Sequence, residues 1–256
     1  MTTIRSLPAA RRHTWHFLRF VRTASPVYLD TEVDATRLLA HKHAANRRYS
    51  VVSYVMHGVS RAVAECPEAN AACAGGLRPR IVNRESVDVK LALDKGIAGR
   101  RAVLSVVVPD CDLMSLDAIQ DTVDRLRDTA GEEIPELRGA RVLQRLPLPV
   151  GRVAFGWANR LRSRHRRMGT VAVTSLGHRP VTRFFSSGGT TLTFGLGRIT
   201  DRPAVRERKL CVMPILPVSL TFDHRVIDGA AAADVLGNLK DRLETLTSRN
   251  AGGPIP

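Results

Sequence analysis

The most informative segment of this chain is Pro217-Val218-Ser219-Leu220-Thr221-Phe222-Asp223-His224-Arg225-Val226-Ile227-Asp228-Gly229. Apolar residues alternate up to Phe222, which predicts a β-strand that places Phe222 and His224 on one face. After Gly229, leucine and valine recur at helical spacing up to residue 246. The segment therefore predicts a strand that carries an imidazole to the rim of an apolar surface and then turns into a helix.

A histidine at such a turn can do chemistry. An imidazole removes a proton from a thiol or hydroxyl when one ring nitrogen is free and the other is held by a hydrogen bond. Asp228, four residues after His224, is placed to cap the following helix through its carboxylate and to hold a nearby arginine. Gly229 would allow close backbone approach. The alternative is a hydrogen-bonded histidine at an ordinary turn, and its surroundings must decide between the two.

Strands and helices mix along the rest of the chain. Strands are expected at 27–33, 80–82, 87–93, 103–108, 170–176, 190–196 and 211–222. Helices are expected at 15–21, 35–45, 51–63, 116–126 (with Ser115 as N-cap) and 229–246. Without regular β-α-β alternation, this order favours a layered mixed α/β domain over a doubly wound one. We assign no single conformation to 129–168.

Composition indicates one folded domain. The chain has 256 residues, 44% of them hydrophobic, enough for a sizeable core. We expect a single catalytic domain over 1–250 and a short flexible tail at 251–256. No apolar run is long enough to span a bilayer. The segment before Asp30 contains arginines but no acidic residue; it could be an organellar transit peptide, but we favour a first amphipathic helix.

Neither a disulfide framework nor a metal site is expected. The four cysteines, Cys66, Cys73, Cys111 and Cys211, lie far apart without a C-x-x-C pair, which fits reduced thiols in a cytoplasmic protein. His41 and His43 are two apart on an expected helix, so their side chains diverge.

The motif Asp223-His224-Arg225 followed by Asp228-Gly229, with Met213-Pro214 before its strand, resembles the active-site signature of the acyltransferase components of 2-oxo acid dehydrogenase complexes. That family shares its fold with chloramphenicol acetyltransferase. Residues 169–177 resemble a strand that the family writes with a Gly-Thr start and a Ser-Asn-Leu-Gly end. Segments 31–39, 66–71 and 197–203 match in the same order. The resemblance implies a coenzyme A-dependent acyltransferase of mixed α/β layers.

The resemblance also implies a role for individual residues. His224 would be the general base that deprotonates the thiol of coenzyme A or of a dihydrolipoyl group. The Thr174 hydroxyl would stabilise the oxyanion of the tetrahedral intermediate; without the resemblance it would be an ordinary strand threonine. Asp228 would be structural, in a salt bridge to Arg11 or Arg12. The residues that would contact substrate are Ser175, His178 and Gly229.

The resemblance implies partners as well. Members form trimers in which the histidine of one chain meets the hydroxyl of its neighbour, so we expect a homotrimer. The substrate would be a coenzyme A thioester, and the acceptor would arrive in trans as a dihydrolipoyl domain, a carrier protein or a small molecule. The catalytic pattern begins within the first dozen residues, and Asp94-Lys95 lies inside it, so no lipoyl group is expected on this chain. Where the family has Asn, Ser175 stands here, which affects the shape of the substrate channel.

Charge leaves further alternatives open. The formal net charge is +15, and only five of the 39 basic residues are lysines. Such a field attracts polyanions, although a proteome-wide bias toward arginine produces the same count. Nucleic acid is not expected, because zinc-finger spacing and RNP-like aromatic motifs are missing. The arginines of 129–168 could bind coenzyme A phosphates, a carrier protein or only water. A non-catalytic trimeric scaffold and a basic polyanion-binding protein are the competing functions.

Overall fold

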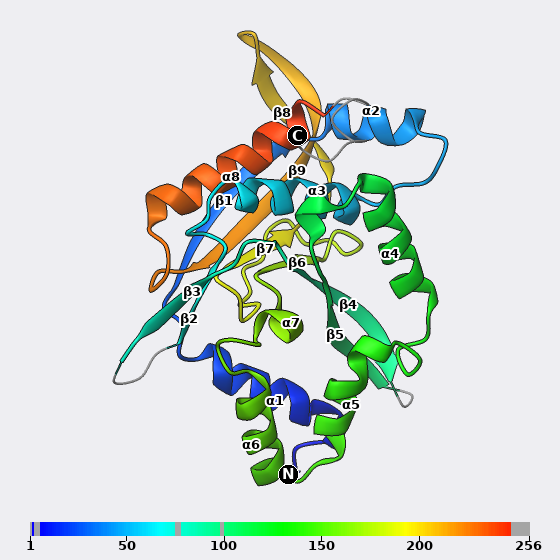
Figure 1. The fold of residues 1–256 in the computed structure, drawn as a ribbon. Helices are drawn as coiled ribbons and strands as arrows, with labels where there is room; N and C mark the ends of the chain where they lie inside the picture. Colours follow the sequence, from blue (N-terminus) through cyan, green and yellow to red (C-terminus); the bar gives the residue numbers. More distant parts are fainter. Residues whose placement is uncertain (1, 3–5, 75–77, 98–99, 247–256) are drawn as a thin grey trace.

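The computed structural model describes residues 2, 6–74, 78–97 and 100–246; the expected tail at 251–256 lies outside them. The mixed α/β prediction is confirmed (Figure 1). The main sheet has the strand order β1-β9-β7-β6-β4-β5, and β8 also pairs with β9. Its strands are β1 (Pro26–Asp34), β4 (Val89–Ile97), β5 (Arg100–Val108), β6 (Val171–Ser175), β7 (Leu192–Leu196), β8 (Thr200–Arg206) and β9 (Lys209–Asp223). A separate pair consists of β2 (Ala71–Ala74) and β3 (Arg80–Asn83).

Helices pack around this sheet. They are α1 (Arg12–Val21), α2 (Thr36–Ala44), α3 (Val51–Ala64), α4 (Leu116–Asp128), α5 (Arg138–Arg145), α6 (Leu148–Ala158), α7 (His165–Met168) and α8 (Gly229–Glu244). Short 3-10 turns lie at Ala9–Arg11, Cys111–Leu113 and Pro135–Leu137. No helix in the described ranges is both long enough and apolar enough to cross a membrane.

Strand β9 is the strand around which the sheet is organised, because it pairs with β1, β7 and β8. Val218, Leu220 and Phe222 alternate along it and enter the main hydrophobic core. The register pairs Pro26 of β1 with Asp223. This pairing brings the first strand of the sheet alongside the end of β9, where His224 follows.

Helices α3 and α8 cover the apolar face of the sheet. They approach closely at Gly58, where an added Cβ would lie 2.9 Å from Leu239 Cδ1. The helix α3 begins at Ser50, whose Oγ accepts a hydrogen bond from the Ser53 N–H at 3.1 Å, as an N-cap does. The two helices pack against each other, and they contact the sheet at β1 (from α8) and β6 (from α3).

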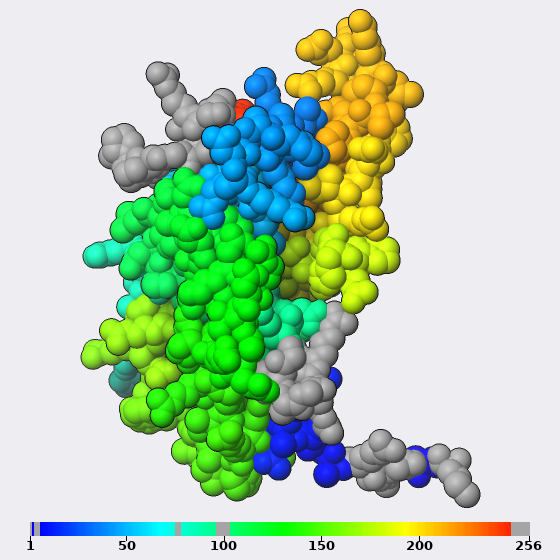
Figure 2. Space-filling model, turned by 90° about the vertical axis from the view of Figure 1, so that its right-hand side faces the viewer, coloured from blue at the N-terminus to red at the C-terminus, as the bar shows by residue number. Residues whose placement is uncertain are grey.

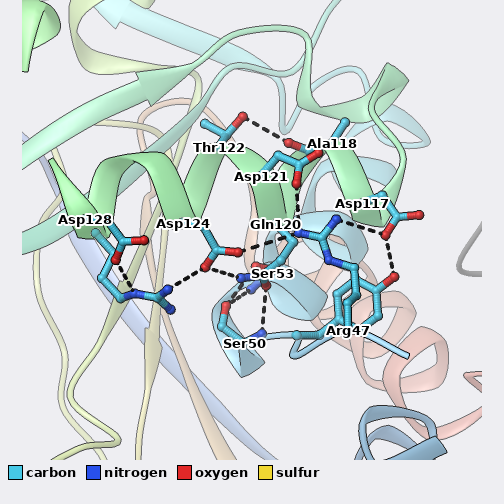
Figure 3. Close-up of polar contacts among 12 residues, drawn as sticks. Arg47, Ser50, Ser53, Asp117, Ala118, Gln120, Asp121, Thr122, Asp124 and Asp128 are labelled. Carbon is cyan, nitrogen blue, oxygen red and sulfur yellow. Dashed lines mark hydrogen bonds and ion pairs between the residues drawn. The ribbon is translucent and has the colours of Figure 1, made fainter. Parts of the chain in front are cut away.

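A buried glutamine joins α3 to α4 (Figure 3). Gln120 has no exposed surface, and its Oε1 accepts hydrogen bonds from Ser50 N (2.8 Å) and Ser53 Oγ (2.7 Å). Its Nε2 donates to Asp124. At the surface of the same joint, Arg47 Nη2 lies 2.8 Å from Asp121 Oδ1. The start of α3 is thus fixed by an amide inside the joint and by an ion pair outside it.

Removal of this amide should destabilise the fold. In Gln120→Leu the Ser50 N–H and the Ser53 hydroxyl lose their acceptor, and we expect the free energy of unfolding to fall by about 1–3 kcal/mol. Asp121→Asn, which weakens only the exposed ion pair, should cost less than about 1 kcal/mol. Urea denaturation of both variants measures the difference. Equal costs would contradict the role given to Gln120.

The segment 129–168, to which we assigned no single conformation from the sequence, contains helices α5, α6 and α7. Figures 1 and 2 show α5 and α6 beside α1, at the end of the molecule away from the β8–β9 hairpin. The buried His16 of α1 stacks on Phe155 of α6 at 6.1 Å between ring centroids. At Gly151 a Cβ would lie 2.6 Å from His16 Nε2, so any larger residue there would force the His16 ring to move.

Candidate active site

His224 follows the last residue of β9 and is held there by its backbone. Its N–H donates to the Ser25 carbonyl at 2.9 Å, which ties it to the start of β1. Its ring lies 5.6 Å from the Phe222 ring, on the face where β9 meets the core. The side chain is 47% exposed. The imidazole is therefore fixed at its base and open to a ligand.

Asp228 is the acidic neighbour of His224. Its Oδ1 lies 3.6 Å from His224 Nδ1, which is ion-pair range but longer than a hydrogen bond. A carboxylate on this side favours a proton on Nδ1 and leaves Nε2 as the acceptor nitrogen. Asp228 occupies the N-cap position of α8, but its side chain makes no capping hydrogen bond. The predicted cap through the carboxylate is therefore wrong.

Within one copy of the chain, the expected salt bridge between Asp228 and an N-terminal arginine is not formed. Among the described residues, neither Arg11 nor Arg12 forms an ion pair with Asp228. Arg12 Nη1 instead donates to the carbonyls of Gln144 (3.5 Å) and Leu146 (3.0 Å) at the end of α5. Carbonyl groups at a helix C-terminus lack intrahelical partners and attract cations. In one copy of the chain, Arg12 therefore binds the end of α5, a helix that the sequence did not predict, and the salt bridge to Asp228 stays a prediction.

Asp223 and Arg225, which flank His224, form an ion pair. Both residues belong to the sequence motif, but the sequence analysis assigned neither of them a role. Arg225 Nη2 lies 2.6 Å from Asp223 Oδ2, and Arg225 Nε lies 2.9 Å from Oδ1. Burial by itself raises the pKa of Asp223, but hydrogen bonds from Arg225 and from the Ser25 N–H outweigh it, so the pKa is lowered. The two-residue period of the strand could have indicated this pair, because it turns both side chains to the same side, away from the Phe222 face.

Thr174 lies at the other end of the sheet. It pairs with Gly195 of β7, which pairs with Ser219 of β9. The step from Ser219 to His224 is five residues, and two strand spacings separate β6 from β9. At ~3.4 Å per residue and ~4.8 Å per strand, Thr174 and His224 are about 20 Å apart in one chain.

The two residues also occupy different faces of the sheet. Val171 and Val173 enter the core that contains Phe222, so alternation turns Thr174 to the opposite face. A single copy of the chain therefore does not bring the Thr174 hydroxyl to the His224 imidazole.

The remaining predicted residues divide between these two ends. Ser175 ends β6, and its Oγ accepts a hydrogen bond from the Gly177 N–H at 3.3 Å; His178 is exposed in the following turn. Gly229 begins α8, where a Cβ would be 3.9 Å from Phe222. One group is thus His224 with Asp228 and Gly229, and the other is Thr174 with Ser175 and His178.

No group of three or more His, Cys, Asp or Glu side chains within the described ranges could hold a metal ion. His41 Nδ1 lies 2.8 Å from the Tyr54 hydroxyl. His57 is buried in α3, and burial lowers its pKa to about 4. Both histidines are therefore parts of the packing.

Comparison with known proteins identifies the family of this chain. The model of the 2-oxoacid dehydrogenases acyltransferase (catalytic domain) family matches residues 3–137 and 156–249. The chain is 26% identical over 241 residues to the dihydrolipoyllysine-residue acetyltransferase component of the pyruvate dehydrogenase complex of Bacillus subtilis, covering 86% of this chain and 45% of that protein. It spans about half the length of the curated relatives it matches.

Solved structures share the fold. A probable dihydrolipoamide acetyltransferase from Listeria monocytogenes superposes with a TM-score of 0.71 at 19% identity, covering 98% of this chain and 97% of that one. The dihydrolipoamide acetyltransferase of Azotobacter vinelandii gives 0.71 at 20% identity, covering 95% and 92%. A chloramphenicol acetyltransferase gives 0.50 at 18% identity, covering 90% and 94%. With the family model matched along most of its length, the chain belongs to the catalytic-domain family of the 2-oxoacid dehydrogenase acyltransferases.

Proposed function

We propose that this chain transfers an acyl group between coenzyme A and a thiol, hydroxyl or amine acceptor, with His224 as general base. The observation that carries the proposal is the exposed His224 imidazole, held between Phe222 and the Asp228 carboxylate at the end of β9. In a chain of this family, that geometry suits proton removal from an incoming thiol.

The proposed reaction conserves atoms and charge at each step. His224 Nε2 takes the proton of the attacking thiol, and the thiolate adds to the carbonyl carbon of the acyl thioester. The carbonyl oxygen becomes the oxyanion of a tetrahedral intermediate. When the intermediate collapses, the carbon–sulfur bond to the leaving group breaks, and the imidazolium returns its proton to the departing thiolate. Asp228 lies on the Nδ1 side of the ring, with its Oδ1 3.6 Å from that nitrogen.

Thr174 would donate its hydroxyl to that oxyanion from a neighbouring copy of the chain. The separation of about 20 Å within one copy supports this arrangement, because the two groups can meet only across an interface. In the Azotobacter vinelandii enzyme a serine, a histidine and an asparagine were investigated for roles in catalysis, with the histidine 52 residues after the serine and the asparagine four after the histidine. Here His224 follows Thr174 by 50 residues and precedes Asp228 by four. The proposed assembly is a homotrimer.

The β8–β9 hairpin supports such an assembly. It projects from one corner of the molecule (Figures 1 and 2), and its Val205, Leu210 and Val212 side chains are about three-quarters exposed. Apolar side chains gathered on a projecting ribbon are typical of surfaces that another protein covers. We assign this surface to a second copy of the chain.

A charge on the hairpin should break the assembly. Leu210→Asp is expected to elute as a smaller species than wild type and to lose transfer activity, while its circular dichroism spectrum stays unchanged, because the side chain contributes nothing to the core of one copy. Val103→Asp, at a similarly exposed position on β5, is the matched control and should keep the wild-type mass. Light scattering of both variants gives the result; a Leu210→Asp protein of wild-type mass would contradict the assignment.

The proposal places the protein in the cytoplasm, which the four free cysteines support. The acceptor in this proposal is carried by another molecule, and no lipoyl group on this chain takes part. Release of free coenzyme A from a panel of acyl-coenzyme A donors, with dihydrolipoamide, an amine and an alcohol as acceptors, tests the function. Release above the uncatalysed rate with at least one pair is expected. No release with any pair would favour the non-catalytic scaffold.

A further inference from the structure

A cavity of about 560 Å³ lies behind the end of β9, on the side to which Asp223 and Arg225 point. Its walls come from α1, β2, residues 159–165 and residues 187–191. His224, Asp228 and Thr174 do not line it. The volume suits a small organic ligand, so the cavity could hold a molecule other than the acyl group.

The cavity wall carries more positive than negative charge. Four arginines line it, against one carboxylate, Asp223, and the arginines are Arg84, Arg160, Arg164 and Arg225. Only Arg225 pairs with that carboxylate. In the described part of the chain, the other three form no ion pair. Arg84 donates to the carbonyls of Leu161 and Arg162. Three guanidinium charges therefore remain without a counter-ion around this space.

Of the three arginines, Arg164 has the strongest need for an anionic partner. Its Nη2 donates to the Cys73 carbonyl at 2.8 Å, and its Cζ lies 5.1 Å from the centre of the Phe20 ring. Its Nε is buried without a hydrogen-bond partner, and burial lowers the pKa of the guanidinium. Arg164 is partly buried, and a guanidinium with a buried, unused donor is costly unless an anion accompanies it.

Two further polar atoms of the wall are also buried without a partner. They are His165 Nδ1 and Asn159 Oδ1; Asn159 is only 9% exposed. The first can donate to a ligand oxygen when the ring is protonated or carries its proton on Nδ1, and the second can accept from a ligand hydroxyl. Both belong to the segment that also supplies Arg160 and Arg164. The wall thus offers donors for an anion and an acceptor beside them.

We infer that this cavity binds the phosphate group of a small organic ligand. A phosphate carries up to two negative charges and accepts hydrogen bonds from several directions, which suits a wall lined by the guanidinium groups of Arg84, Arg160 and Arg164. The apolar wall of Phe20, Val21 and Leu161 would receive the organic part. The inference does not rest on the proposed acyl transfer, and its test does not depend on activity.

The experiment measures binding of inorganic phosphate to the full chain by titration calorimetry at constant ionic strength. We expect one saturable site per chain. Arg164→Gln and the more exposed Arg160→Gln should each raise Kd about tenfold, since each loses a charge-assisted hydrogen bond. Arg166→Gln removes the same charge from a neighbouring exposed residue outside the cavity and should stay within twofold of wild type.

Two results would overturn the inference: no saturable phosphate binding, or an equal loss in all three variants, which would reflect net charge alone. Because Arg160 is exposed, its variant keeps the test valid if Arg164→Gln fails to fold. Competition then identifies the source of the phosphate group. Displacement of phosphate by coenzyme A but not by glycerol phosphate would assign the site to the coenzyme, and the reverse would assign it to a separate phosphate ester.

Discussion

His224→Ala is expected to slow acyl transfer by about 10²–10⁴-fold, the usual contribution of a positioned general base. Without the imidazole, the attacking thiol must lose its proton to water, so the loss should appear in kcat and less in KM. The fold should survive, because the His224 side chain is half exposed and its anchor to Ser25 is made by the backbone. Steady-state kinetics with the best donor and acceptor pair measures the effect.

The control for this variant is His43→Ala, which removes an exposed imidazole on α2 and should leave the rate unchanged. The pH dependence of the rate loss in His224→Ala gives a second test. If His224 is the base, the loss should be smaller at high pH, where the thiol ionises without help. A His224→Ala enzyme within twofold of wild type at neutral pH would remove this residue from the mechanism.

Thr174→Ala is expected to cost about 10²–10³-fold in kcat, as loss of one oxyanion donor does, whereas Thr174→Ser should keep most of the rate. The second variant retains the hydroxyl and loses only a methyl group. Kinetics of the pair separates hydroxyl chemistry from strand packing. Equal losses in both variants would contradict an oxyanion role.

The two inactive variants also test where the site is built. If His224 and Thr174 come from different copies, unfolding and refolding an equal mixture of His224→Ala and Thr174→Ala chains restores both groups at about one quarter of the interfaces. Activity near that fraction of wild type is expected. If both groups acted within one chain, no site in the mixture would be complete and activity would stay at the level of the separate variants.

Local patterns were enough to predict most of the regular elements. The apolar period of α3, the Ser115 cap of α4, whose Oγ accepts from Ala118 N at 3.2 Å, and the alternation along β9 all hold in the structure. Strand β2 was missed because Ala71–Ala74 is alanine with one cysteine, which has no β signature. Strand β8 contains Pro203, which reads as a break but is tolerated because β8 pairs only with β9.

The segment 129–168 shows a different limit. Leu146-Pro147-Leu148-Pro149 suggests an irregular chain, yet its prolines stand at the N-cap and first turn of α6, where no N–H is needed. Because these helices could not be predicted, two of their contacts were not predicted either. Arg12 donates hydrogen bonds to carbonyls at the end of α5, and residues of the segment 159–165 line the charged cavity. His224 and Thr174 were found through the resemblance, but their separation of about 20 Å depends on strand register, which periodicity alone does not supply.

The pairing of β1 with β9 affects how the protein folds during its synthesis. Pro26 and Asp223 face each other across the sheet, so a contact between distant parts of the sequence closes the fold, and high contact order of this kind slows folding. During synthesis on a ribosome, β1 waits without its partner until β9 has been made. The backbone bond from His224 to Ser25 then forms with the last strand. A prematurely terminated product would therefore lack both its reactive imidazole and the neighbour of its first strand, and would leave an unpaired edge for quality-control proteases and chaperones to find.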